Sequence, residues 1–324
     1  MIKQKLKNSK FSRGIIGFFY LIRPVNLFII GFTAFLTWQA LIGGLLENFN
    51  KGLHLSPENL VFLILSIILV GAGGYIINDY FDTTIDEINK PAKQIIGKYI
   101  SAKRALVLYG TVTATGIIFA FIPAIRIGNY QIAMLHIIFA LALWFYSEQF
   151  KYVKFWGNFV VSLSTAFVVI VMWLYEFFAM VNDNEILIGQ ESRLLNYFVL
   201  GYAAFAFISN FARELVKDRQ DVPGDIRAGV KSLAVTMSDK GFRILVYVTL
   251  GLNFVMLLLA QIFLYNMELI LVSWYLFLPE FMLIYLTWVL SKARIEKDYA
   301  NMSLYMKAYI LAGILSMQVL YISW

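Results

Sequence analysis

Acidic and amide side chains gather where the second long apolar run of the sequence ends. Asn78, Asp79, Asp82 and Asp86 follow one another at helical spacing directly after this run. At about 100° per residue, the four side chains share a face about 100° wide. The spacing therefore predicts a cluster of oxygen donors at the end of an apolar helix.

A second acidic cluster follows the sixth apolar run. Asp218, Asp221 and Asp225 would lie within about 60° of one another if the helix continued through all three. The pair Pro223-Gly224 lies between the last two. Because proline lacks a backbone donor and clashes with the preceding turn, we expect the helix to end near Asp221.

The two clusters together favour a cation site. Carboxylates gathered at the ends of apolar helices repel one another unless a cation lies between them. Magnesium takes oxygen ligands, keeps several waters and is often completed by substrate phosphates. One cluster alone would equally suit a solvated helix end, but two clusters with matched spacing indicate a Mg²⁺-bridged diphosphate held by nearby lysines and arginines.

The elements that position these clusters are membrane-spanning helices. The 324 residues are 60% hydrophobic and 15% charged, with a mean hydropathy of +0.72, whereas soluble domains are roughly 45–50% apolar and about 25% charged. Backbone groups in lipid must bond within the segment, and no alternating ten-residue pattern indicates a β-barrel. We expect an all-α polytopic membrane bundle of nine transmembrane helices. Residues 1–324 should form a single domain, of which residues 1–14 are a basic cytoplasmic tail. The nine apolar segments are 15–46, 59–81, 104–125, 129–147, 156–180, 193–213, 242–264, 267–290 and 302–323.

The basic residues predict the orientation of this bundle. Lysine and arginine concentrate in the N-terminal tail and in the loops after the even-numbered segments. This pattern predicts a multi-pass integral membrane protein whose N-terminus and acidic loops are cytoplasmic. The net charge of +7 then reflects topology, so we expect no nucleic-acid partner. With no cysteine and two histidines, disulfides, thiol nucleophiles and a multi-histidine zinc site are excluded.

The acidic motifs resemble those of a known family. Asn78-Asp79-x-x-Asp82-x-x-x-Asp86 is similar to the first aspartate-rich motif of the UbiA family of intramembrane prenyltransferases, and Asp218-x-x-Asp221-x-x-x-Asp225 is similar to the second. Further matches are Arg23-Pro24-x-Asn26, Tyr146 with Lys151, and Gly157-Asn158. The family's nine-helix fold, with motifs after helices 2 and 6, agrees with the segments counted above. The second motif most resembles the geranylgeranylglyceryl phosphate geranylgeranyltransferase branch.

The resemblance implies a Mg²⁺-dependent transfer of a prenyl group from an allylic isoprenyl diphosphate to an acceptor. The catalytic side chains it implies are Asn78, Asp79, Asp82, Asp86, Asp218, Asp221 and Asp225. The metal ligands among them are Asn78, Asp82, Asp86, Asp221 and Asp225. The diphosphate would be bound by Arg23, Lys93, Lys151 and Lys217, and the substrates by Asn26, Tyr146 and Glu214. Lys93 stands where the family usually has arginine, so it lacks the bidentate fork.

Several other side chains carry expectations of their own. Aromatic rings attract cations, and the candidates to shelter an allylic cation are Phe28, Phe32, Tyr75, Tyr146, Phe205 and Phe207. We expect Glu176, near the outer end of its segment, to reach the membrane interface. His136 is expected to be a hydrogen-bonded packing residue. Arg213 and Glu214 could pair with each other or touch the acceptor, and because adjacent helical residues face apart, pairing is the less favoured option.

The acceptor is left open by the sequence. A phosphorylated acceptor such as geranylgeranylglyceryl phosphate needs an extra basic pocket, whereas an aromatic acceptor of quinone biosynthesis needs a polar patch and a slot for its ring. A more distant alternative is an ion-coupled transporter. Transporter sites, however, lie near the bilayer midplane at broken helices, and the acidic clusters here lie at helix ends.

Overall fold

The computed structural model describes residues 10–89 and 94–324, and helices form nearly all the regular structure of these ranges. Nine helices within them are long and apolar enough to cross a membrane. Their bounds are Pro24–Asn48, Pro57–Phe81, Ala102–Arg126, Tyr130–Glu148, Trp156–Asn182, Gln190–Arg227, Asp239–Asn266, Ile270–Lys292 and Glu296–Ser323. The predicted all-α membrane bundle with nine spans is confirmed.

The first apolar segment is divided where we predicted one continuous run from 15 to 46. Helix α2 (Lys10–Ile22) ends before Arg23, and α3 (Pro24–Leu36) begins after it. Arg23 has a left-handed backbone with φ of 52°. The physical reason is the following proline, which disfavours helical geometry in the residue before it. Arg23 is therefore the residue at which the first apolar segment changes from one helix to the next.

The first span continues beyond α3 without a further break in direction. It passes through a π-helical stretch, η1 (Thr37–Gly43), and ends in α4 (Gly44–Asn48). The next span begins sharply, because Pro57 occupies the first turn and the Ser56 side chain accepts a hydrogen bond from the backbone N–H of Asn59. The serine cap therefore fixes the start of the helix that carries the first acidic motif.

That helix, α5 (Pro57–Phe81), packs against α7 (Ala102–Arg126) and α8 (Met134–Glu148). Gly116 of α7 allows close approach, because a Cβ atom there would lie about 3.1 Å from the backbone nitrogen of Val70. The short helix α6 (Thr83–Asn89) follows α5 directly. The first motif is thus held on a firmly packed helix and its extension.

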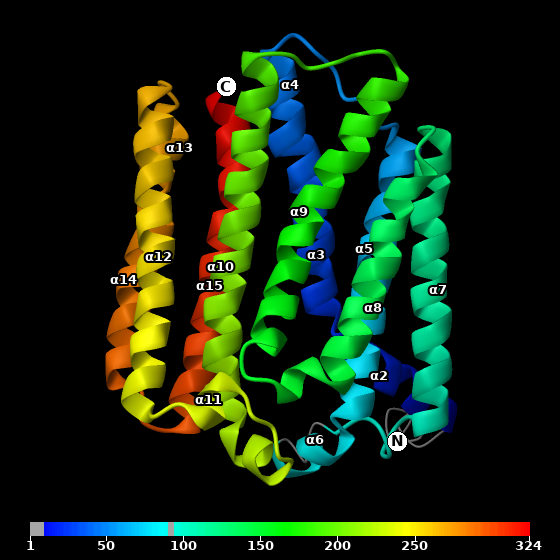
Figure 1. Cartoon of the computed structure of the whole chain (residues 1–324), viewed down its shortest axis with the longest axis vertical. Coiled ribbons are helices and arrows are strands. Elements are labelled where there is room, and N and C mark those ends of the chain that lie inside the picture. Colours follow the sequence, from blue (N-terminus) through cyan, green and yellow to red (C-terminus); the bar gives the residue numbers. More distant parts are fainter. Residues whose placement is uncertain (1–9, 90–93) are drawn as a thin grey trace, which may run out of the picture.

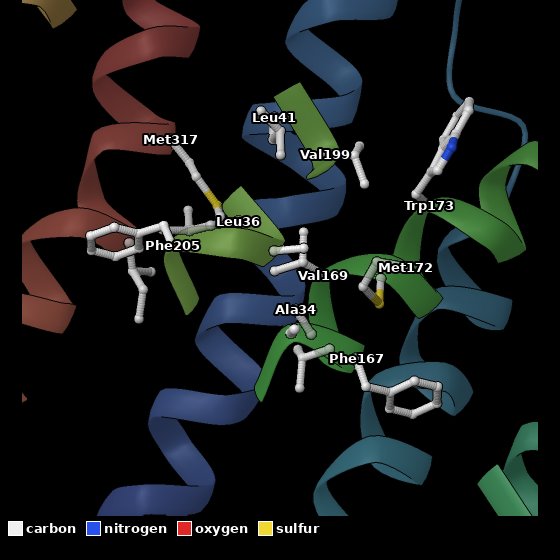
Figure 2. Packing of buried hydrophobic residues seen from close by; sticks show 14 of the residues in the cluster. Ala34, Leu36, Leu41, Phe167, Val169, Met172, Trp173, Val199, Phe205 and Met317 are labelled. Carbon is white, nitrogen blue, oxygen red and sulfur yellow. The ribbon is translucent and has the colours of Figure 1, made fainter. Parts of the chain in front are cut away.

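The core lies where the first span meets α9 (Trp156–Asn182), α10 (Gln190–Arg227) and α15 (Glu296–Ser323). Figure 2 shows this packing, with Val169 and Met172 facing Ala34 and with Phe205 beside Met317. Two 3₁₀ turns, η3 (Tyr130–Ala133) and η4 (Phe150–Tyr152), precede α8 and α9 respectively.

The remaining helices form the outer part of the bundle beside α10 and α15. They are α11 (Leu233–Thr236), α12 (Asp239–Asn266), α13 (Ile270–Tyr275) and α14 (Phe277–Lys292). Large apolar side chains on α12 and α14 are exposed, which suits a surface that faces hydrocarbon. With nine such spans the protein is a multi-pass integral membrane protein.

The two ends of the bundle differ in what they carry. Figure 1 shows α2, α6 and α11 at one end, and α4 with the C-terminus at the opposite end. Both acidic motifs lie at the end that holds α6 and α11, since α5 and α10 run toward it. We call this end the motif end.

Candidate active site

A polar cavity of about 900 Å³ opens at the motif end. Every catalytic, metal-binding or substrate-binding residue predicted from the sequence lines it, except Lys93, which lies outside the described residues. The predicted residues brought together are Arg23, Asn26, Asn78, Asp79, Asp82, Asp86, Tyr146, Lys151, Glu214, Lys217, Asp218, Asp221 and Asp225. Residues that are far apart in the sequence therefore line the same cavity.

The first motif is held by hydrogen bonds within its own helix face and by one lysine. The backbone N–H groups of Asp82 and Asp86 donate to the carbonyls of Asn78 and Asp82, so helical bonding continues across the α5–α6 junction. The Asn78 side chain donates through Nδ2 to Asp82 Oδ2 at 2.7 Å. Lys151 Nζ, from η4, lies 2.5 Å from the other Asp82 oxygen. The expected shared face is thus retained despite the change of helix.

Arg23 reaches the first motif because of the break between α2 and α3. Its guanidinium donates to Asp79 Oδ1 at 2.5 Å, and Asp79 is 6% exposed. The same guanidinium lies over the Tyr75 ring, 5.0 Å from its centroid. A charge that would be costly to bury alone is therefore paired and stacked at the cavity wall.

The second motif stays helical throughout, which corrects the expected end near Asp221. Helix α10 includes Pro223 and continues to Arg227. Proline removes one hydrogen bond, but the helix continues for one more turn to Arg227, two residues before Gly229, whose φ is +72°. Asp218 accepts a hydrogen bond at 2.8 Å from the side chain of Asn158 on α9. Asp218, Asp221 and Asp225 all line the cavity as a result.

Glu214 lies one turn before the second motif and bridges two cations. Arg213 Nη1 lies 2.9 Å from Glu214 Oε1, and Lys217 Nζ lies 3.1 Å from Glu214 Oε2. The less favoured option, pairing of Arg213 with Glu214, is therefore the one observed. The Cβ atoms of adjacent helical residues do diverge, but the arginine side chain is long enough to bend back toward the same polar cavity.

The donor set at the motif end suits a divalent metal. Within residues 10–89 and 94–324, no three acidic or histidine side chains form a preassembled metal site. Lys151 and Asn158 instead hold Asp82 and Asp218. One acceptor is unmatched, since Asn78 Oδ1 is buried without a hydrogen-bond partner beside Asp82. The cavity thus has carboxylate and amide oxygens on two walls, and one of these oxygens, Asn78 Oδ1, has no hydrogen-bond partner. Such oxygens fit a hard cation whose remaining ligands come from substrate phosphates.

An apolar cavity of about 270 Å³ continues inward from the polar one. The residues that line both cavities form their junction: Arg23, Asn26, Asn78, Tyr146, Arg213, Glu214, Lys217 and Lys307. Deeper, the walls are formed by Ile67, Phe139, Phe167, Phe205 and Met317. The molecule thus joins a charged chamber to a hydrocarbon-lined one inside a single bundle.

Three of the six expected aromatic residues line these cavities. Tyr75, Tyr146 and Phe205 do so. Phe28 is 70% exposed and stacks on Phe32, and neither ring lines a cavity; Phe207 is also absent from both linings. An apolar helix offers rings on every face, and the sequence could not distinguish the face turned inward.

His136 is buried at the wall of the apolar cavity, as expected for a packing residue, but it is not hydrogen-bonded. Its ring contacts Phe167 and Tyr175 edge-on, and both ring nitrogens lack a partner in the described chain. Glu176 also departs from expectation, because it is fully buried rather than at the interface. It accepts hydrogen bonds from Trp38 and from the backbone of His54.

Sequence reasoning missed one cavity residue and left the role of another open. Lys307 of α15 lines both cavities, and its signal was present, since it is the single charge in the apolar segment 302–323. Arg213 was expected either to pair with Glu214 or to touch the acceptor, with pairing the less favoured of the two.

A charged chamber that leads into an apolar one, inside a bundle of membrane-spanning helices, suits a molecule with an anionic head and a hydrocarbon tail. The UbiA prenyltransferase family model matches residues 36–311. The chain therefore belongs to the UbiA prenyltransferase family, and it is a prenyltransferase.

Named relatives agree with this membership. The digeranylgeranylglyceryl phosphate synthase of Methanococcus vannielii is 30% identical over 269 residues, covering 82% of this chain and 85% of that protein. A solved structure concerning digeranylgeranylglyceryl phosphate synthase in membranes has a TM-score of 0.61 at 22% identity, covering 96% of this chain and 99% of the other. A UbiA homolog from Archaeoglobus fulgidus bound to DMAPP and Mg²⁺ has a TM-score of 0.57 at 16% identity, covering 92% and 98%. These structures share the fold.

Proposed function

We propose that this prenyltransferase moves a geranylgeranyl group from its diphosphate to geranylgeranylglyceryl phosphate. The observation that carries the proposal is the joining of the two cavities: both acidic motifs and their cations line one, and apolar side chains line the other. The relatives named digeranylgeranylglyceryl phosphate synthase support this acceptor over an aromatic one. Family membership sets the transporter alternative aside.

The diphosphate would lie in the polar cavity. Mg²⁺ would be held there by Asn78, Asp82, Asp86, Asp221 and Asp225, and when bound it supplies charge neutralisation for the leaving diphosphate. Arg23, Lys151 and Lys217 would bind the phosphate oxygens by charge-assisted hydrogen bonds. Lys93 keeps the same proposed role from outside the described residues.

Release of the diphosphate leaves positive charge on the allylic carbon, which water would quench. The apolar cavity would exclude water around the prenyl tail; Tyr146 lines both cavities, and Tyr75 lines the apolar one beside Arg23. Their ring faces would stabilise the cation by about 0.5–2 kcal/mol each. The chain thus separates a charged leaving group from a protected carbon centre.

The acceptor hydroxyl forms the new C–O bond and must lose its proton. Asp79 is held by Arg23, whereas Asp218 is bonded through one oxygen to Asn158. We propose that Asp218 accepts this proton. Asp79 instead positions Arg23. Asn26 and Glu214, at the junction, would orient the acceptor between these groups.

We also propose that the motif end is cytoplasmic and that the bilayer surrounds the nine spans. Figure 1 supports an odd number of crossings, since α2 and α6 lie at one end and the C-terminus at the other. The basic residues of the N-terminal tail and of the loops after even-numbered segments support the cytoplasmic assignment.

The test is a transfer assay with purified protein in detergent or lipid. Radiolabelled geranylgeranyl diphosphate and Mg²⁺ are incubated with geranylgeranylglyceryl phosphate, 4-hydroxybenzoate or dihydroxynaphthoate. We expect transfer to the first acceptor, and its loss with EDTA and in Asp82→Ala and Asp221→Ala. The exposed Glu296, at the start of α15, provides the control variant Glu296→Ala. Transfer to an aromatic acceptor alone would overturn the proposed acceptor.

A further inference from the structure

The junction between the two cavities carries more positive than negative charge. Its charged residues are Arg23, Arg213, Lys217, Lys307 and one carboxylate, Glu214. Asp79, which pairs with Arg23, adds a second carboxylate. Asp86 and Asp218 also attract Arg23 and Lys217, so the excess of two positive charges falls on Arg213 and Lys307. An uncompensated excess in a partly buried site favours an anionic ligand.

Arg213 is only partly satisfied by the protein. One of its terminal nitrogens lies 2.9 Å from Glu214, and its side chain is 16% exposed. Its Nε atom, however, is buried and has no hydrogen-bond partner in the described chain. An unpaired buried donor destabilises the site, so a ligand that accepts from it gains a strong bond.

Lys307 has no carboxylate partner in the described chain. Its Nζ contacts the Asn26 side-chain oxygen at 3.4 Å, a long and neutral hydrogen bond. Arg213, Lys217 and Arg23 are close enough to repel its charge, and the attraction of Glu214 is weaker than this repulsion. A lysine held among three cations at the membrane-embedded mouth of a cavity is unfavourable unless an anion joins it.

The face of α15 beside Lys307 leaves room for such an anion. Ala300, Ser303 and Leu304 line the polar cavity on the same face, at helical spacing of three and four residues from one another. Two of these side chains are small, and Leu304 is 64% exposed at the outer edge. This face therefore runs from the surface of the bundle to Lys307.

We infer that Arg213 and Lys307, with Asn26, bind the phosphate monoester of the acceptor. A phosphate monoester carries roughly 1.5 to 2 negative charges at neutral pH, which matches the excess of two. The prenyl diphosphate has its own cations in Arg23, Lys151 and Lys217, on the side that carries the acidic motifs. The inference rests on the proposed function, and it supplies the extra basic pocket that a phosphorylated acceptor needs.

The experiment measures KM for the two substrates separately, in detergent, with the full chain. In Lys307→Met and Arg213→Gln, we expect KM for geranylgeranylglyceryl phosphate to rise about 10- to 100-fold, as for a lost charge-assisted hydrogen bond. KM for geranylgeranyl diphosphate should stay within about twofold of wild type. Lys307→Arg, which retains the charge, should recover most of the affinity.

A second arm replaces the acceptor with geranylgeranylglycerol, which lacks the phosphate. Wild type should prefer the phosphorylated acceptor, and Lys307→Met should lose most of that preference. Lys292→Met, an exposed lysine at the end of α14, is the control and should change neither KM. Thermal unfolding checks that each variant is folded.

The outcomes separate the inference from the proposed function. A rise in KM for the diphosphate instead of the acceptor would assign Arg213 and Lys307 to the donor and overturn the inference, while the proposed function stands. Equal KM values for both acceptors in wild type would also overturn it. Failure of wild type to use geranylgeranylglyceryl phosphate at all would overturn the proposed function itself.

Discussion

Both ends of the bundle bury charged groups, but the two ends treat them differently. At the end opposite the motifs, the Glu176 carboxylate accepts from Trp38 Nε1 at 2.8 Å and from the backbone N–H groups of His54 and Leu55. At the motif end, Asn78 Oδ1 and Arg213 Nε are buried without partners. A fully bonded buried carboxylate fixes a loop, whereas unmatched donors and acceptors lining a cavity leave bonds for a substrate to make.

The largest effect should follow from removing a carboxylate at the motif end. Asp82→Ala or Asp221→Ala should lower kcat for prenyl transfer at least about 100-fold, because charge on the leaving diphosphate is no longer neutralised. The midpoint of thermal unfolding should change little in Asp221→Ala, whereas Asp82→Ala also removes the bonds to Asn78 and Lys151 and should lower the midpoint. If a variant lost stability but retained its kcat, the carboxylate at the motif end would serve the fold rather than the reaction, and the contrast between the two ends would fail.

Removing the Glu176 carboxylate should lower stability and leave kcat unchanged. Glu176→Ala would leave the indole of Trp38 and the backbone of His54 and Leu55 without acceptors, at about 1–3 kcal/mol for each buried group. We expect a lower unfolding midpoint in detergent and unchanged kcat for the folded fraction. Glu176→Gln keeps one acceptor oxygen and should recover part of the stability. A fall in kcat at unchanged stability would give this end a catalytic role.

His136 tests whether every buried group without a partner serves the substrate. Its ring nitrogens have no hydrogen-bond partner in the described chain, yet it lines only the apolar cavity and not the charged junction. A prenyl tail has no hydrogen-bonding groups, so nothing in the apolar cavity would bond its ring nitrogens. His136→Leu should raise the free energy of unfolding by about 1 kcal/mol, through removal of an unsatisfied polar group, without lowering kcat. Measured turnover more than tenfold below wild type would show that an imidazole nitrogen takes part in the reaction.

The smallest effect concerns pH at the end opposite the motifs. Burial alone would lower the pKa of His54, but hydrogen bonds from its ring to Asp183 and Glu185 outweigh burial and raise it. The hydrogen bond of His54 lowers the pKa of Asp183, and that of Lys51 lowers the pKa of Glu185.

A raised histidine pKa contributes stability below pH 6.5 that is lost as pH rises through the folded-state value. The lowered carboxylate pKa values contribute stability above their ordinary values of 3.8 and 4.5, and this is lost as pH falls. The unfolding midpoint should therefore decrease slightly above pH 6.5, and His54→Asn should abolish that decrease. The same slope in both proteins would assign it to other groups.

Helical spacing explains how much of the site could be predicted. Asn78, Asp82 and Asp86 share a face because backbone bonding continues past the end of α5, and the nine spans followed from apolar length alone. Contacts that depend on a single side chain or a single residue's backbone were not predictable. Arg23 reaches Asp79 through a left-handed backbone, Arg213 bends back to its neighbour, and Glu176 is buried by a loop that packs over it. Each of these three contacts depends on tertiary packing and not on the helical repeat of the sequence.

The shared junction also predicts an order of binding. Eight residues line both cavities, among them Lys307 and Arg213. If the prenyl tail enters the apolar cavity through this junction, it must be seated before an acceptor head group occupies the same passage. The steady-state rate law should then be that of an ordered sequential reaction with the donor first, and excess acceptor should inhibit by blocking the empty enzyme.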